Sequence, residues 1–117
     1  MSTDSVFLYH LVTAEEAAGL QQHDEYRAPS LETEGLIHAS GSIEQVIRTA
    51  NRLFSGQGDL VALRVRRDRI RSEVRYEESG DREPFPHIYG PLSTDAIDAV
   101  LRMVRDEAGT FVGIEGE

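Results

Sequence analysis

Short runs of apolar residues, many of them β-branched or aromatic, predict five strands in this chain. Residues 6–12 and 60–65 are almost wholly apolar, which is typical of buried strands. Residues 36–39 form a shorter apolar run, and residues 74–77 alternate apolar with charged positions, as a partly exposed strand does. The apolar run 111–114 is the fifth predicted strand.

Apolar residues at helical spacing predict three helices. The first, 14–22, begins with the capping box Thr13–Glu16, in which the two side chains satisfy backbone amides at the helix start. The second, 43–54, begins with a similar box. The third is predicted over 94–108, before Gly109. Its apolar stripe consists of Ala96, Ile97, Val100, Leu101 and Val104.

Prolines and polar residues shape two further segments. Residues 23–34 are polar, and Pro29 disfavours the helical conformation for its predecessor, so this stretch is predicted to be a loop. Three of the four prolines fall within residues 84–91, which argues against a regular central strand there but permits an extended piece at 87–89. The backbone on both sides of His87 is therefore expected to be rigid.

The irregular mixture of strands and helices predicts the fold class α+β. With 117 residues and no internal repeat, the chain has the usual length of one domain, so we take residues 1–117 as a single domain. The hydrophobic fraction is 39% and the charged fraction 28%. Because the apolar residues come in periodic clusters, this composition indicates a folded chain.

Cysteine content and the N-terminal residues narrow the classes of protein. The chain has no cysteine, which excludes disulfides, thiolate metal sites and cysteine nucleophiles and favours a cytoplasmic location. The residues after Met1 lack the basic and apolar parts of a secretory leader, and no stretch approaches the roughly 18 apolar residues that span a bilayer. No membrane partner is expected.

The formal net charge of -9 opposes binding to polyanions through a general field, so broad nucleic-acid binding is not expected. Net charge does not govern a single pocket, however. A small phosphate-bearing ligand is compatible with this chain if a few arginines gather around it. The candidates are Arg27, Arg48 and Arg52.

Three of the four histidines follow one pattern, next to apolar residues and close to a hydroxyl group. His10 follows Tyr9, His38 precedes Ser40 by two residues, and His87 precedes Tyr89 by two residues within the proline-rich segment 84–91. Histidine changes its protonation near neutral pH and can both donate and accept hydrogen bonds, so several on one sheet can hold a polar ligand or move protons. The alternative is a set of core or turn histidines bonded to carbonyls.

Other kinds of site fit the sequence less well. Three imidazoles can hold zinc, but no close histidine pair occurs, so no metal ligand is assigned and a metal-dependent hydrolase stays a lesser alternative. Ser40 does not stand in the nucleophile motif Gly-x-Ser-x-Gly and is better explained by the nearby helix start. Gly56 and Gly58 are only a fragment of a dinucleotide fingerprint.

Four blocks of the sequence resemble the bacterial family called Domain of Unknown Function 952, over about residues 6–105. The blocks are Leu8 to His10, Ser30 to Ser40, Asp59 to Val61 and Phe85 to Leu92. That family is similar to the ADP-ribosyltransferase fold, in the branch of the RNA 2'-phosphotransferases, where NAD lies between two small sheets. The resemblance implies a split β-sheet core with about three helices and a small nucleotide-like ligand, with NAD as the substrate.

The same resemblance implies roles for individual residues. Tyr9 and His10 match the Tyr-His position that holds the nicotinamide ribose, which makes His10 the strongest candidate. His38 with Ser40, and His87 with Tyr89, match the second and third positions more loosely. The catalytic candidates are His10, His38 and His87, and the cofactor-binding candidates are Tyr9, His10, Ser40, Asn51 and Tyr89.

One departure from the resemblance narrows the expected activity. The third block contains no glutamate, which classical transferases use there, so ordinary protein ADP-ribosylation is not expected. An NAD-using transferase or NAD glycohydrolase is the first hypothesis, with a phosphorylated or nucleotide-like small acceptor. The second is a nucleotide-binding module without catalysis.

Overall fold

The computed structural model describes residues 6–56 and 58–116, which form a single α+β domain, as the sequence predicts. Three α-helices and nine strands follow one another in an irregular order within this part of the chain. The strands are β1 Phe7–Thr13, β2 Glu25–Tyr26, β3 Ile37–His38, β4 Leu60–Arg66, β5 Glu73–Glu77, β6 Phe85–Tyr89, β7 Leu92–Ser93, β8 Ile97–Arg105 and β9 Phe111–Glu115. The α-helices are α1 Ala14–Ala18, α2 Pro29–Glu34 and α3 Ile43–Leu53, and short 3-10 turns cover Leu20–Gln22, Arg67–Arg69 and Thr94–Ala96.

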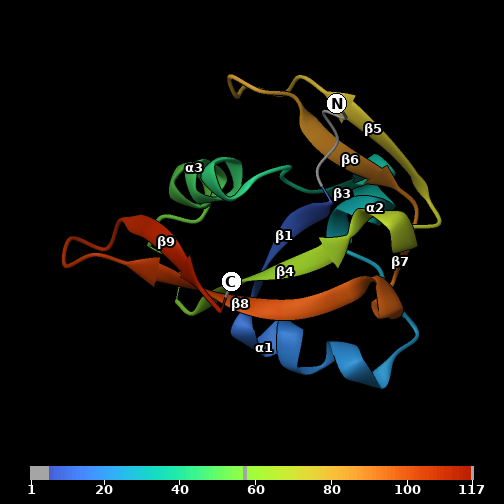
Figure 1. Cartoon of the computed structure of the whole chain (residues 1–117), viewed down its shortest axis with the longest axis horizontal. Coiled ribbons are helices and arrows are strands. Elements are labelled where there is room, and N and C mark those ends of the chain that lie inside the picture. The colour runs from blue at the N-terminus through green and yellow to red at the C-terminus, as the bar shows by residue number, and fades with distance from the viewer. Residues whose placement is uncertain (1–5, 57, 117) are drawn as a thin grey trace.

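The strands form three separate antiparallel sheets (Figure 1). The largest has the order β1-β4-β8-β9, the second has the order β3-β6-β5, and β2 pairs with β7. A bridge between Tyr9 and Ser40 joins the first two sheets, through hydrogen bonds of 2.9 Å from Tyr9 N to Ser40 O and 2.8 Å from Ser40 N to Tyr9 O. This bridge holds the edge of β1 next to β3.

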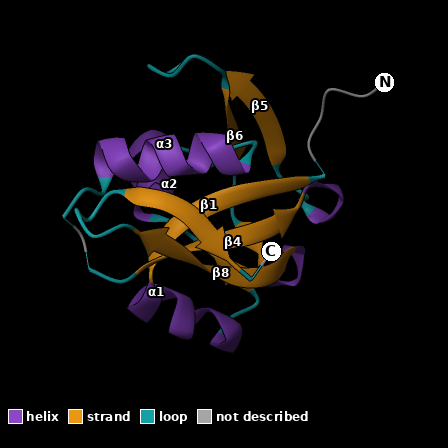
Figure 2. Ribbon diagram, turned by 60° about the vertical axis from the view of Figure 1, so that its left-hand side comes forward, coloured by secondary structure: helices purple, strands orange, loops and turns teal. Residues whose placement is uncertain are grey.

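Helices α1 and α3 cover opposite faces of the four-stranded sheet (Figure 2). Alternate residues of the central strand β4 divide between the two cores: Leu63 packs with the α1 side and Ala62 with the α3 side. In β1, Leu8 belongs to the first core and Tyr9 to the second. This alternation follows from the pleat of a strand, whose successive side chains point to opposite faces.

The predicted starts of the first two helices are confirmed. Thr13 accepts a hydrogen bond from Glu16 N and Glu16 accepts from Thr13 N, which completes the capping box of α1. Ser42 caps α3 by accepting from Gln45 N. The first helix is shorter than predicted, because α1 ends at Ala18 and a 3-10 turn continues the chain to Gln22.

The helix predicted over residues 94–108 is wrong, because this segment is mainly strand β8. The apolar stripe that fits helical spacing fits alternation as well: Leu101 and Met103 are buried, whereas Val100 and Arg102 are exposed. β8 pairs with the central strand β4 along most of its length. The hydrogen bonds and burial of that pairing outweigh the local helical pattern, because strand preference depends on the neighbouring strand.

The loop predicted over residues 23–34 is wrong in part, since it contains β2 and α2. Pro29 stands at the first position of α2, where its fixed φ suits a helix and its missing N–H leaves no partner unpaired. The helix ends at Gly35, whose φ of 81° is the left-handed conformation that glycine adopts easily.

Strand β6 is longer than the extended piece predicted at residues 87–89, and it lies between β3 and β5 despite its proline. The carbonyl oxygen of Pro86 accepts a hydrogen bond of 3.2 Å from Ala39 N. In an antiparallel strand the nitrogen and the carbonyl of one residue face the same side, so the nitrogen of Pro86 also faces the β3 side, beyond the last residue of β3. The missing N–H therefore costs no hydrogen bond to β5. It is lost only opposite Ala39, one residue beyond the end of β3, which is how a central strand tolerates this residue. No helix in the described part of the chain is long and apolar enough to cross a membrane.

Candidate functional site

A cleft of about 490 Å³ lies where the free edge of β1 meets α3 and the segment from β2 to Ser40. This volume is within the range of roughly 300–1,000 Å³ that is usual for small-molecule sites. The side chains that define its chemistry are Tyr9, His10, Tyr26, His38, Arg52 and Phe85. Four predicted site residues, Tyr9, His10, His38 and Ser40, are thus brought together.

His10 is buried and bonded on both sides of its ring. Its Nδ1 lies 2.5 Å from the carbonyl oxygen of His38, and its Nε2 lies 3.0 Å from the hydroxyl of Tyr26. Because a carbonyl can only accept, we infer that Nδ1 carries the proton and that Nε2 accepts a hydrogen bond from Tyr26. Burial lowers the pKa of His10, so the neutral ring is favoured.

Tyr26 completes this pair from β2, a segment that the sequence pattern did not identify. Burial, with the nearby carboxylate of Glu16, raises the pKa of Tyr26 to about 12. The hydroxyl therefore keeps its proton at neutral pH. Together, Tyr26 and His10 present an uncharged, ordered polar pair to the cleft.

The lowered pKa of His10 predicts a pH dependence of stability. The unfolded chain takes up a proton on His10 below about pH 6.5, whereas the folded chain resists it, so the free energy of unfolding falls as the pH falls. One such group contributes up to about 1.4 kcal/mol per pH unit. Urea unfolding between pH 7 and 5 is expected to show a smaller slope for His10→Gln than for the unchanged protein. Equal slopes would contradict this prediction.

His38 contributes its backbone and its side chain in different places. The backbone carbonyl holds His10, while the ring lines the cleft and pairs with Glu34 at 3.2 Å. Both side chains of this pair are about half exposed, at 50% and 53%. Even with His38 protonated, an exposed pair of this kind contributes only about 0–1 kcal/mol, so the His38 ring is weakly held.

His87 and Tyr89 do not line the cleft but lie on the face of the neighbouring sheet next to it. Both bond to Glu77 of β5: His87 Nδ1 lies 2.7 Å from Glu77 Oε1, and the hydroxyl of Tyr89 donates to the same oxygen at 2.5 Å. These two hydrogen bonds lower the pKa of Glu77, that from Tyr89 more strongly. The ring of His38 meets the ring of His87 edge-on, with centroids 5.1 Å apart.

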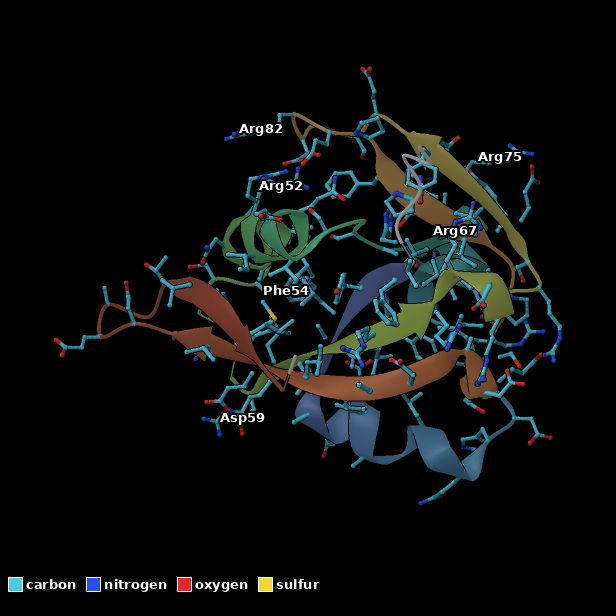
Figure 3. The ribbon with its side chains drawn as sticks, viewed as in Figure 1. Arg52, Phe54, Asp59, Arg67, Arg75 and Arg82 are labelled. Carbon is cyan, nitrogen blue, oxygen red and sulfur yellow. The ribbon has the colours of Figure 1, made fainter. Side chains whose placement is uncertain are left out.

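Of the three candidate arginines, Arg52 lines the cleft. Its guanidinium lies over the ring of Phe85, 5.6 Å from the ring centroid, and extends from α3 toward the β5–β6 hairpin (Figure 3). Arg48 instead binds Asp81 through two hydrogen bonds of 3.1 and 2.9 Å. Arg27 is exposed and pairs with Glu25. Arg52 is therefore the cation available to an anionic ligand in the cleft.

The structure places Asn51 away from the cleft, where it has a structural partner. Its side chain donates to Phe111 O at 2.9 Å and accepts from Phe111 N at 2.8 Å. This reciprocal pair joins α3 to β9, so the Asn51 amide is already satisfied. Ser40 lines the cleft but is only 2% exposed, and its backbone forms the bridge to Tyr9.

The sequence interpretation missed two residues, Tyr26 and Glu77. Tyr26 stands in a short polar stretch with no periodic pattern, and Glu77 occupies a charged position in the alternating pattern of a partly exposed strand. Neither has a local signal, because each acquires its role through a partner 10 to 16 residues away in the chain. Among the described residues, no three histidine, aspartate or glutamate side chains gather as a metal site would require.

Comparisons with known proteins identify the family of the chain and solved structures with a similar fold. The model of a family described as "Protein of unknown function (DUF952)" matches residues 11–100, which confirms that part of the sequence resemblance. The crystal structure of protein CC0527 from Caulobacter crescentus is 25% identical, with a TM-score of 0.78 over 91% of this chain and 93% of that chain. Its solution NMR structure is 26% identical, with a TM-score of 0.73 over 89% and 90%. No curated protein matches.

Proposed function

The chain belongs to the DUF952 family, and we propose that its cleft binds NAD and cleaves the bond between nicotinamide and ribose. One observation carries the proposal: the neutral His10–Tyr26 pair lies in the same cleft as Arg52, a cation with no ion-pair partner among the described residues. The pair suits uncharged hydroxyl groups, and the cation suits a phosphate. A dinucleotide supplies both kinds of group.

The free edge of β1 offers backbone groups in this cleft that can form hydrogen bonds with a carboxamide. The N–H and C=O of Tyr9 both face Ser40, so those of Leu11, two residues further along, face the same side. Leu11 lines the cleft. A backbone N–H beside a C=O can pair with the amide of nicotinamide, which offers one acceptor and two donors.

Aromatic and apolar side chains form most of the remaining wall. Phe54, Phe85 and Tyr26 line the cleft, and Figure 3 shows Phe54 beneath α3. Such faces suit the flat rings of a nucleotide, with a few polar groups to orient them. The resemblance to the ADP-ribosyltransferase fold supports the same class of ligand.

The proposed chemistry follows from these groups. Nicotinamide leaves with the electron pair of the bond to ribose, and an oxygen nucleophile bonds to the resulting oxocarbenium-like carbon and releases its proton. The oxygen of Tyr26 can still accept a hydrogen bond and would orient a ribose hydroxyl, while His10, whose two nitrogens are already bonded, would hold Tyr26 in place during the reaction. A fixed, uncharged pair suits this role because no charge has to be desolvated first.

A second candidate function is binding of the same ligand without turnover. Among the described residues, Glu16 is the only carboxylate that lines the cleft. Its Oε1 is already bonded to the amide and hydroxyl of Thr13, at 2.9 and 3.1 Å. A carboxylate held in a helix cap is less able to stabilise a developing positive charge, which favours a binding module.

Calorimetry with NAD, followed by chromatographic assay for released nicotinamide, separates these candidates. Binding with release supports the proposed cleavage, and binding without release supports the module. Absence of binding to NAD and to ADP-ribose would overturn both. Nicotinamide alone is expected to bind weakly, because it leaves the Arg52 side of the cleft empty.

Replacement of Arg52 by glutamine is expected to weaken binding of NAD and ADP-ribose about tenfold, or about 1.4 kcal/mol. Binding of nicotinamide alone should not change. The matched control is Arg82→Gln, since Arg82 is exposed and extends away from the ribbon in Figure 3. Calorimetry measures all three affinities, and an equal loss in both variants would show a general charge effect instead of a phosphate contact.

A further inference from the structure

The sheet β3-β6-β5 carries polar side chains on the face turned away from the core. Strand pairing sets His38 directly beside His87 in this sheet. Ile37 and Ile88, the next residues along each strand, are fully buried in the core on the opposite face. The polar face therefore continues from the cleft, at His38, to the Glu77–His87 pair on the adjoining strands.

His87 has one satisfied and one unsatisfied nitrogen. Its side chain is 7% exposed, and Nδ1 bonds to the carboxylate of Glu77, whereas Nε2 is buried and has no hydrogen-bond partner among the described residues. A carboxylate only accepts, so Nδ1 carries a proton, and in the neutral ring the lone pair lies on Nε2. A buried acceptor without a partner costs about 1–3 kcal/mol, and such groups in folded proteins call for an explanation.

His38 is the titratable side chain in ring contact with His87, and it is also the one that lines the cleft. The two rings stand edge-on, at an angle of 88°. His38 is held in its present position by the exposed Glu34, an interaction weak enough for side-chain exchange. Release from Glu34 would let a nitrogen of His38 turn toward the unpaired Nε2.

We propose that His87, oriented by Glu77, is a buried proton acceptor for the cleft and that His38 relays the proton to it. An acceptor with a hydroxyl group, water or an alcohol, gives its proton to His38 as its oxygen bonds to the ribose carbon. His38 passes its other ring proton to Nε2 of His87, and the resulting imidazolium faces the carboxylate of Glu77. This relay rests on the proposed function, since the bound dinucleotide supplies the reacting carbon.

The surrounding charges are consistent with this relay. Tyr89 donates to the same oxygen of Glu77 and so helps to fix the carboxylate. Arg75, opposite His87 on β5, is paired with Glu73 through bonds of 2.9 and 3.0 Å and lies over the ring of Tyr89. Glu77 therefore remains the anion directly bonded to His87.

Nitrogen-15 NMR of the histidine rings tests the relay without any ligand. The His87 Nε2 signal is expected in the unprotonated range. Glu34→Gln, which loosens His38, should move it toward the hydrogen-bonded range, and adding His38→Phe to that variant should reverse the movement. Glu77→Gln should mix the two tautomers of His87, whereas Glu78→Gln, at the exposed neighbouring side chain, should not. A protonated Nε2, or a signal that Glu34→Gln does not move, would overturn the proposal.

Kinetics then test the relay in turnover. His87→Gln and His38→Phe are each expected to lower kcat for nicotinamide release about 100-fold, within the usual contribution of general base catalysis, and to change KM less than about threefold. Unchanged kcat in His38→Phe, a substitution at an exposed side chain, would overturn the relay. If the protein does not bind NAD, the proposed function is wrong. The nitrogen signals then show separately whether His38 turns toward Nε2 of His87 or the two rings keep one fixed arrangement.

Discussion

Replacement of His10 by alanine is expected to abolish detectable NAD binding and to lower the free energy of unfolding by about 2–4 kcal/mol. The ring satisfies two buried groups, the hydroxyl of Tyr26 and the carbonyl of His38. Alanine leaves both without partners and opens a cavity beside them. Calorimetry with NAD measures the loss of binding, and urea unfolding measures the loss of stability.

Two further variants separate the binding effect from the folding effect. His23→Ala removes an exposed histidine and should change stability by less than about 0.5 kcal/mol. Tyr26→Phe keeps the aromatic ring and removes one hydrogen bond, with an expected loss of about 1–2 kcal/mol and weaker NAD binding. If folded His10→Ala binds NAD as the unchanged protein does, the proposed function is wrong.

Replacement of Gln45 by leucine is expected to lower the free energy of unfolding by about 3–4 kcal/mol. Gln45 lies on α3 and is only 2% exposed. Its Oε1 accepts from Gly41 N at 2.7 Å, and its Nε2 lies 3.1 Å from the carbonyl oxygens of both Glu83 and Pro84. Leucine fills a similar volume but satisfies none of these backbone groups.

The same substitution should also weaken NAD binding, because Gln45 fixes α3 against the segment before β6. Arg48 strengthens that connection by binding Asp81, which lowers the pKa of this carboxyl well below its usual range. Movement of α3 would shift Arg52 relative to Phe85. Gln22→Leu, at an exposed glutamine, is the matched control and should stay within about 0.5 kcal/mol. A loss below 1 kcal/mol for Gln45→Leu would contradict the prediction.

Local signals in the sequence were sufficient for the framework of the fold. The capping boxes at Thr13 and Ser42 predict the starts of α1 and α3, because these hydrogen bonds form between residues three positions apart. The continuous apolar runs that became β1 and β4 predict strands buried on both faces. The α+β class follows from the order of such segments.

The sequence also determined part of the candidate site. Its four blocks were sufficient to identify the family, and they included His10, His38 and Ser40, which line one cleft. The selection of Arg52 as a phosphate ligand stays a prediction, but the structure does place it in that cleft. These residues could be named because each lies in or near an element with a clear pattern.

Tertiary structure alone decided the remaining parts. The segment that became β8 has apolar residues that fit both periods, and only pairing with β4 selects the strand. Tyr26 belongs to the site because its hydroxyl reaches His10, and His87 is separated from the cleft lining because strand pairing sets it behind His38. Capping and periodicity act over a few residues and can be read from the chain. Hydrogen bonds and burial between distant segments depend on where the sheets place those segments.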